Sequence, residues 1–246
     1  MTSSPWCADP GCTPRIRLFG TFRLTVDGRA VDTPLGVQRL LAVLALRERA
    51  SRARLAGLLW PEGSQRQAMT NLRKACWRLQ GAVPGHLLVV AAGHDLRLVP
   101  EVASDVATLV RAVHDRLGSD GPSAHWPPDP DVLDELVDPE AADLLSDWDD
   151  PWLEADRERL RQLRLHVLED WAARLTDAGD YVLALEVALC ALRADVLRES
   201  AHRAVIRVHR AEGNVQEARR AFAVCTAVLD REIGIAPSPA TVALVP

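Results

Sequence analysis

Apolar residues between positions 35 and 80 recur at a helical period. The spacing predicts three helices, over residues 37–47, 51–60 and 65–79. Ser51 is the expected N-cap of the second helix, because its hydroxyl can accept a hydrogen bond from an unpaired amide of the first turn. Pro61–Ser64 ends that helix, since proline disfavours a helical residue before it and glycine frees the backbone. The last two helices would form a helix–turn–helix.

The predicted helix over residues 65–79 has two chemically different faces. Its apolar stripe consists of Ala68, Leu72, Ala75 and Leu79, and its opposite arc is rich in arginine and amide side chains. This arc suggests a DNA-reading helix, and the same pattern also fits an ordinary solvated helix. Arginine suits guanine and an amide suits adenine, so the candidates for base contact are Gln67, Thr70, Asn71 and Arg73. The candidates for phosphate contact are Arg66, Lys74 and Arg78, with Arg52 and Arg54 on the preceding helix.

Short β-type segments flank the three helices. Residues 15–32 alternate around the turn Asp27–Gly28, which predicts a hairpin. A second hairpin is predicted from residues 87–90 and 96–99, and its polar residues His94 and Arg97, which could project from it, are further candidates for DNA contact. A helix–turn–helix followed by such a ribbon is a winged helix, with the ribbon as the wing. Trp77 lies opposite the leucines, and we expect it to pack on the wing or the second domain.

The chain after Pro100 has a helical pattern without strands. Gly179–Asp180 and Gly213–Asn214 lie 34 residues apart, and Ala184 and Ala218 repeat at the same offset. Helix pairs at this period are typical of tetratricopeptide-like arrays. Helices are predicted over residues 106–117, 132–137, 139–145, 153–176, 181–193, 199–212 and 215–232. The expected core residues are Trp171, Leu175, Leu185, Leu189, Val205, Val208, Phe222 and Val228.

Length and charge support a division into two domains. We expect a flexible tail at residues 1–14, a winged helix at 15–100 and an all-α repeat domain at 101–246, a mainly α protein overall. Residues 1–100 hold 13 Arg and one Lys against four Asp and two Glu, a net charge of +8, whereas the remainder carries −13. A basic front favours binding of a polyanion. Five scattered cysteines fit a reducing cytoplasm, and no apolar run is long enough for a membrane span.

Other chemistries find little support in the sequence. The acidic residues Asp143, Asp147, Asp149 and Asp150 have no suitably spaced histidine, and the neighbouring Trp148 indicates a packed domain junction. Cys7 and Cys12 have no second ligand pair for zinc. Neither a nucleophile elbow nor a phosphate loop occurs. We therefore expect no enzyme activity, no metal and no cofactor.

Four segments resemble the OmpR-type winged helix of the Streptomyces antibiotic regulatory protein family: residues 16–24 (IRLFGTFRL), 38–46 (QRLLAVLAL), 54–61 (RLAGLLWP) and 71–79 (NLR…WRL). Residues 47–50 are shorter than the turn usual in that family and are compatible with helix. Residues 150–170 and 230–239 resemble the bacterial transcriptional activator domain that follows this winged helix in the family. Residues 240–246 are too short for the full helix expected there.

The resemblance implies a sequence-specific activator of secondary-metabolite genes. In that family the third helix lies in the major groove, targets are direct repeats on double-stranded DNA, and the helical domain serves dimerisation or contact with the RNA polymerase holoenzyme. The alternative is a helical-repeat adaptor whose winged helix binds protein instead of DNA. The acidic net charge and the larger share of the chain given to repeats motivate that alternative.

Overall fold

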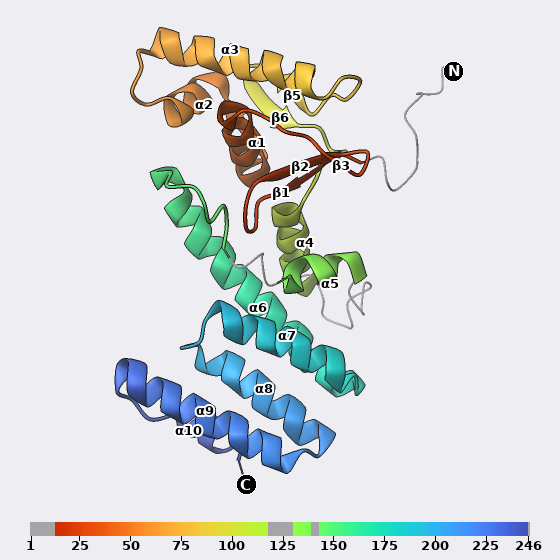
Figure 1. Cartoon of the computed structure of the whole chain (residues 1–246), viewed down its shortest axis with the longest axis vertical. Helices are drawn as coiled ribbons and strands as arrows, with labels where there is room; N and C mark the ends of the chain where they lie inside the picture. The colour runs from red at the N-terminus through yellow and green to blue at the C-terminus, as the bar shows by residue number, and fades with distance from the viewer. Residues whose placement is uncertain (1–12, 118–129, 139–142, 246) are drawn as a thin grey trace, which may run out of the picture. The chain divides into compact units, whose positions relative to one another are not determined.

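A computed structural model describes residues 13–117, 130–138 and 143–245 (Figure 1). The chain divides by its contacts into two compact units. Unit 1 contains residues 1–110 and 143–157, and unit 2 contains residues 111–142 and 158–246. The mainly α architecture, with small N-terminal sheets before a helical repeat region, confirms the predicted fold class. No helix in the described part of the chain is both long and apolar enough to span a membrane.

The first sheet of unit 1 has the strand order β3-β2-β1-β7. Its strands are β1 (Arg15–Arg17), β2 (Arg23–Val26), β3 (Arg29–Ala30) and β7 (Ala103–Ser104). The turn Asp27–Gly28 joins β2 to β3 as predicted. Strand β7 corrects the expectation that no strand follows Pro100, because it pairs in parallel with β1. The backbone also corrects the tail boundary, since Pro14 is buried and its carbonyl accepts from Ala103 N at 2.9 Å.

Three helices form the core of unit 1: α1 (Leu35–Arg47), α2 (Arg52–Leu59) and α3 (Gln65–Ala82). Ser51 caps α2 by accepting from Arg54 N, and Ser64 caps α3 by accepting from Gln67 N. All four residues of the predicted α3 stripe are buried. The helix runs three residues beyond Leu79, and its opposite face is left outside the core.

The second sheet forms the wing and differs from the predicted hairpin. Its order is β4-β6-β5, with β4 (Arg49–Ser51), β5 (Val89–Ala92) and β6 (Asp95–Leu98). The turn is only Gly93–His94, and Gly93 has a positive φ of 64°, so both strands lie closer to the turn than expected. The helix-compatible segment 47–50 is helical only at Arg47, because Glu48 has a φ of 59° and the chain then enters β4.

Residues 143–157 are integrated into unit 1. Gly20 N donates to Asp143 O at 2.7 Å and Leu145 N donates to Leu18 O at 2.8 Å, which adds this segment to the end of β1. The bridge excludes the predicted helix from residues 143–145, and residues 139–142 lie outside the described residues. Trp148 is buried as expected and stacks on Phe22, with ring centroids 6.1 Å apart.

One buried carboxylate links the C-terminal ends of the adjacent parallel strands β1 and β7. Asp105 begins α4 (Asp105–Leu117) and has no exposed surface. Its Oδ2 accepts hydrogen bonds from Leu18 N and Phe19 N, both at 2.7 Å, and its Oδ1 accepts from Val106 N at 2.8 Å. The carboxylate therefore satisfies backbone donors where β1 ends, and nothing in the sequence pattern indicated this role.

Unit 2 is helical in the described residues. Its helices are α5 (Pro130–Val137), α6 (Glu154–Ala178), α7 (Tyr181–Ala194), α8 (Glu199–Glu212), α9 (Val215–Ile233) and the single turn α10 (Pro239–Val242). Helix α6 starts in unit 1, directly after the 3₁₀ turn η2 (Pro151–Leu153). Helix α8 packs against both α7 and α9. Of the expected core residues, Trp171, Leu175, Val205 and Val208 are buried, whereas Leu185, Leu189, Phe222 and Val228 are half-buried.

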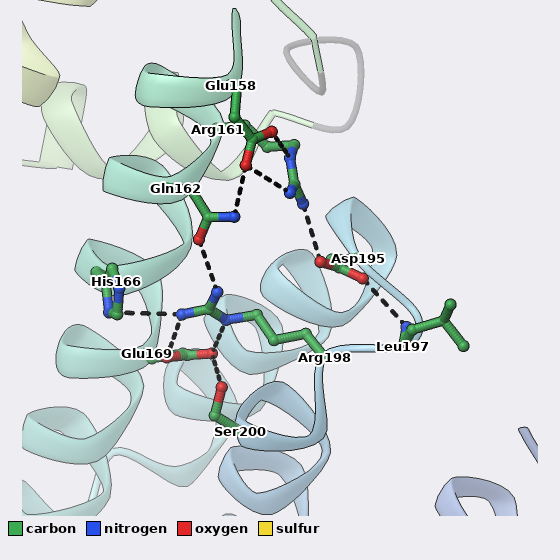
Figure 2. Close-up of polar contacts among 9 residues, drawn as sticks. All are labelled: Glu158, Arg161, Gln162, His166, Glu169, Asp195, Leu197, Arg198 and Ser200. Carbon is green, nitrogen blue, oxygen red and sulfur yellow. Dashed lines mark hydrogen bonds and ion pairs between the residues drawn. The ribbon is translucent and has the colours of Figure 1, made fainter. Parts of the chain in front are cut away.

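A polar network ties α6 to the turn between α7 and α8 (Figure 2). Arg198 Nε donates to Glu169 Oε1 at 2.6 Å, and its Nη1 donates to Gln162 Oε1 at 3.0 Å. One turn away, Arg161 Nη1 donates to Asp195 Oδ2 at 2.8 Å. These bonds cross between segments about 30 residues apart, so they fix the packing of the first repeat.

Replacing Glu199 with glutamine is expected to remove an acid-sensitive part of the stability of unit 2. Glu199 Oε1 accepts from Ser238 N at 2.8 Å and from the Ser238 and Thr241 hydroxyls, which holds α10 against α8. Burial works to raise the pKa of Glu199, but the hydrogen bonds from Ser238 and Thr241, with nearby Arg203, outweigh it and lower the pKa below 4.5. Because the pKa of Glu199 is lower in the folded state than in the unfolded state, the stabilisation from its ionised carboxylate is complete above pH 4.5. It is lost as the pH falls through the folded-state pKa.

Urea unfolding at a series of acidic pH values measures this contribution. The unfolding free energy of the wild type should decline more steeply below pH 4.5 than that of Glu199→Gln. Glu217→Gln, which changes an exposed glutamate of α9, serves as the control. Parallel pH profiles for all three proteins would contradict the assignment.

Candidate nucleic-acid interface

The outward face of α3 carries an unneutralised set of cations. Helix α3 contains no aspartate or glutamate. The side chains of Arg66, Arg73, Lys74 and Arg78 are exposed. None of the four has a hydrogen bond or ion pair with another described residue, which leaves their donors available to an anion. The burial of the Ala68–Leu79 stripe fixes this orientation, because it anchors the opposite side of the helix in the core.

The amide residues lie on one side of this face. Gln67 and Asn71 are one turn apart and line a hollow of about 780 Å³ beside the α2–α3 turn, together with Trp60, Pro61 and Trp152. Gln67 is exposed and Asn71 is half-buried. Thr70 differs from the prediction in one respect, since its Oγ1 donates to Arg66 O at 2.9 Å within the helix. Its hydroxyl oxygen can then act toward a base only as an acceptor.

The other side of the face borders the wing. A hollow of about 480 Å³ separates α3 from β5 and is lined by Arg52, Arg73, Cys76 and Trp77, among others. Burial raises the pKa of the Cys76 thiol, and Arg52 opposes that effect only in part. Cys76 is therefore a neutral wall of this hollow. The hollow combines two guanidinium groups with apolar surface.

Arg52 has a structural role that the sequence did not indicate. Its backbone N–H donates to His94 O at 3.2 Å, and its Nη1 donates to Gly93 O at 3.1 Å. These bonds hold the wing turn against the start of α2. His94 at that turn is exposed. Arg52 therefore positions the wing, and it also lines the hollow with a guanidinium group that has further N–H donors. The other predicted cation of α2, Arg54, is exposed.

A cation of the wing was missed by sequence reasoning. Arg49 in β4 lies directly opposite Arg97 in β6, and both side chains are exposed. Like charges directly opposite on antiparallel strands are destabilising, so an anion between or beside them would relieve the repulsion. Arg49 was missed because residues 47–50 were interpreted as helix-compatible. The pairing of β4 with β6 brings it beside the predicted residue Arg97.

The acidic residues near the start of α6 make structural contacts. Asp150 Oδ2 lies 2.9 Å from Arg39 Nη2, and Asp156 Oδ2 lies 2.7 Å from Arg47 Nη2. Both ion pairs link this segment to α1. Among the residues that the structure describes, no three His, Cys, Asp or Glu side chains converge in a way that could hold a metal ion.

Comparison with known proteins gives matches over both parts of the chain. Residues 137–245 match the bacterial transcriptional activator domain. The regulatory protein AfsR of Streptomyces coelicolor is 28% identical over 231 residues, which cover 92% of this chain and 23% of AfsR. The structure of Mycobacterium tuberculosis EmbR, in complex with a low-affinity phosphopeptide, matches with a TM-score of 0.60 at 20% identity, covering 94% of this chain and 64% of EmbR.

The activator-domain match agrees with the domain type that the sequence resemblance assigns to the helical part of the chain. The chain spans about a quarter of the length of AfsR and about two thirds of the EmbR chain. At 20% identity the EmbR match establishes a shared fold. The helical part carries the activator-domain signature, and the sequence match to AfsR extends over the winged helix as well. Residues 137–245 therefore carry the bacterial transcriptional activator domain, and the chain as a whole is similar to the regulatory protein AfsR.

Proposed function

We propose that this protein activates transcription by binding specific promoter sequences through α3 and the wing. The observation that carries the proposal is the outward face of α3, where four cations without described acidic partners stand beside Gln67 and Asn71. A helix of this kind fits the major groove, and its N-terminal half is the part that contacts base edges in helix–turn–helix proteins. Gln67, Thr70, Asn71 and Arg73 are assigned to bases.

The remaining cations are assigned to the phosphate backbone. Arg66, Lys74 and Arg78 flank the base-contacting residues on α3, and Arg52 and Arg54 stand on the preceding helix. The wing supplies His94 and Arg97, to which the fold adds Arg49. Contacts of this kind set register and orientation and make affinity depend on salt.

Asn71→Ala and Arg73→Ala should each weaken binding to the cognate promoter by about 5- to 100-fold. An amide or guanidinium that pairs with a base edge contributes about 1–3 kcal/mol of discrimination against the wrong base. A gel-shift titration against the promoter of a neighbouring operon, with a scrambled duplex beside it, measures both affinity and specificity. Gln216→Ala and Arg219→Ala, which change exposed residues of α9, are the matched controls. Wild-type affinity in both α3 variants would refute the assigned reading face.

Salt dependence separates DNA binding from the adaptor alternative. If phosphates are neutralised, affinity for duplex DNA should fall steeply between low and physiological salt. Absence of DNA binding by the full chain at any salt concentration would favour an adaptor that binds protein.

The helical unit is proposed to act on the transcription machinery. Recruitment of the RNA polymerase holoenzyme, a cytoplasmic location and control of secondary-metabolite genes are proposed from the resemblance to the Streptomyces antibiotic regulatory proteins. Direct-repeat target sites and a homodimer on DNA belong to the same proposal. Selection of bound duplexes from a random pool would test the repeat, because two copies of one motif in the same orientation should be enriched.

A further inference from the structure

Trp77 lies at the centre of the cationic face of α3 without being packed. Its side chain is 74% exposed, although the sequence pattern indicated packing on the wing or the second domain. At 100° per residue, Trp77 is almost diametrically opposite the buried stripe, with Arg66, Thr70 and Arg73 on the surrounding turns. An exposed indole inside a cluster of cations leaves apolar surface in contact with water in the free protein. A ligand that covers the indole removes this surface from water, which favours binding.

The position of Trp77 along α3 limits the part of a duplex it can meet. It lies more than three turns after the N-cap Ser64, beyond the residues that a recognition helix normally presents to base edges. It also lines the hollow between α3 and β5, together with exposed Leu87 and the guanidinium of Arg73. In a winged helix docked through α3 and the wing, a strand of the duplex would pass this hollow. Deoxyribose offers an apolar surface and the phosphate an acceptor for the indole N–H.

We propose that Trp77 and Leu87 form a non-ionic contact site for the deoxyribose–phosphate backbone between the recognition helix and the wing. The indole face packs on sugar carbons, and its Nε1–H is directed to a phosphate oxygen, while the phosphate-assigned neighbours Lys74 and Arg78 supply the charge. The contact adds affinity for duplex DNA without reading bases and without releasing a counterion. This inference rests on the proposed DNA-binding function.

The salt slope of binding distinguishes Trp77 from its charged neighbours. Trp77→Ala should raise the dissociation constant about five- to tenfold, equally for cognate and scrambled duplexes, and leave the slope of log K against log salt unchanged. Trp77→Phe should recover part of the loss because it restores an apolar ring. Arg78→Ala, which removes an assigned phosphate contact next to Trp77, should instead reduce the slope by about one. Val182→Ala, which shortens a side chain that is 80% exposed on α7, is the control.

The outcomes separate this inference from the proposal beneath it. Wild-type protein that binds no duplex at any salt concentration would overturn both. Normal binding by Trp77→Ala, while Arg78→Ala is impaired, would overturn the Trp77 contact and leave the DNA-binding function in place. A loss in Trp77→Ala that is confined to the cognate duplex, or accompanied by a reduced salt slope, would also overturn it. Loss on both duplexes at an unchanged slope supports it.

Discussion

Replacing Asp105 with alanine is expected to lower the unfolding free energy of unit 1 by about 3–5 kcal/mol. The substitution removes a fully buried acceptor from Leu18 N and Phe19 N, each 2.7 Å from Oδ2. A buried donor left without a partner costs about 1–3 kcal/mol, and bonds to a charged acceptor lie at the upper end. Two such donors therefore account for the expected loss. Asparagine should recover only part of it, because its amide oxygen can replace Oδ2 but carries no full charge, and its NH2 group would then face the Val106 N–H.

Denaturant unfolding followed by tryptophan fluorescence measures this loss. The two units can unfold in separate transitions, so each must be fitted independently. Asp147→Ala changes an exposed aspartate of the same unit and should stay within about 0.5 kcal/mol of the wild type. Equal midpoints for Asp105→Ala and Asp147→Ala would show that the buried carboxylate does not support the sheet.

Neutralising Arg66, Lys74 and Arg78 together to glutamine should weaken DNA binding by about two orders of magnitude near physiological salt. Each phosphate contact contributes about 0.9 to the slope of log K against log salt, so three lost contacts should reduce the slope by almost three. All three side chains are exposed and none has a described partner, so the fold should be unaffected. Fluorescence anisotropy with a labelled duplex at several salt concentrations gives both quantities.

The matched control removes the same number of charges elsewhere. Arg207, Arg210 and Arg219 are exposed on α8 and α9, and their replacement by glutamine changes the net charge equally. If binding depends on the α3 face, this control should retain nearly the full slope. Equal losses in both triple variants would mean that affinity follows net charge alone.

Elements with a strong local pattern were predicted well from the sequence. Helix α8 begins and ends at the predicted residues, and the Ala68–Leu79 stripe of α3 is buried as its period requires. Short strands were missed because their pairing depends on distant residues. Strand β4 has no alternation of its own and exists because Arg49–Ser51 pairs with β6. Strand β7 is likewise set by its parallel partner β1.

In the candidate site, too, features set by local sequence pattern were predicted and features set by tertiary packing were not. Helical periodicity places every predicted α3 residue outside the apolar stripe, and the structure adds that Asn71 is half-buried whereas Arg66 is exposed. Arg49 could not be found from the sequence, since only strand pairing brings it opposite Arg97. Trp77 was identified as unusual, but whether it is covered depends on tertiary packing, which the helical pattern does not contain. The structure leaves it 74% exposed.

The pairing of residues 143–146 with the end of β1 constrains how this winged helix can be inherited. A recombination event that copied only residues 15–100 would leave behind Asp105, strand β7 and Trp148. The transferred piece would lose the acceptor for two backbone donors and the ring that stacks on Phe22. A gene fragment must therefore include the start of the activator domain, through about residue 157, to encode a complete fold. Shuffling of winged helices among regulators of this type should carry that segment along.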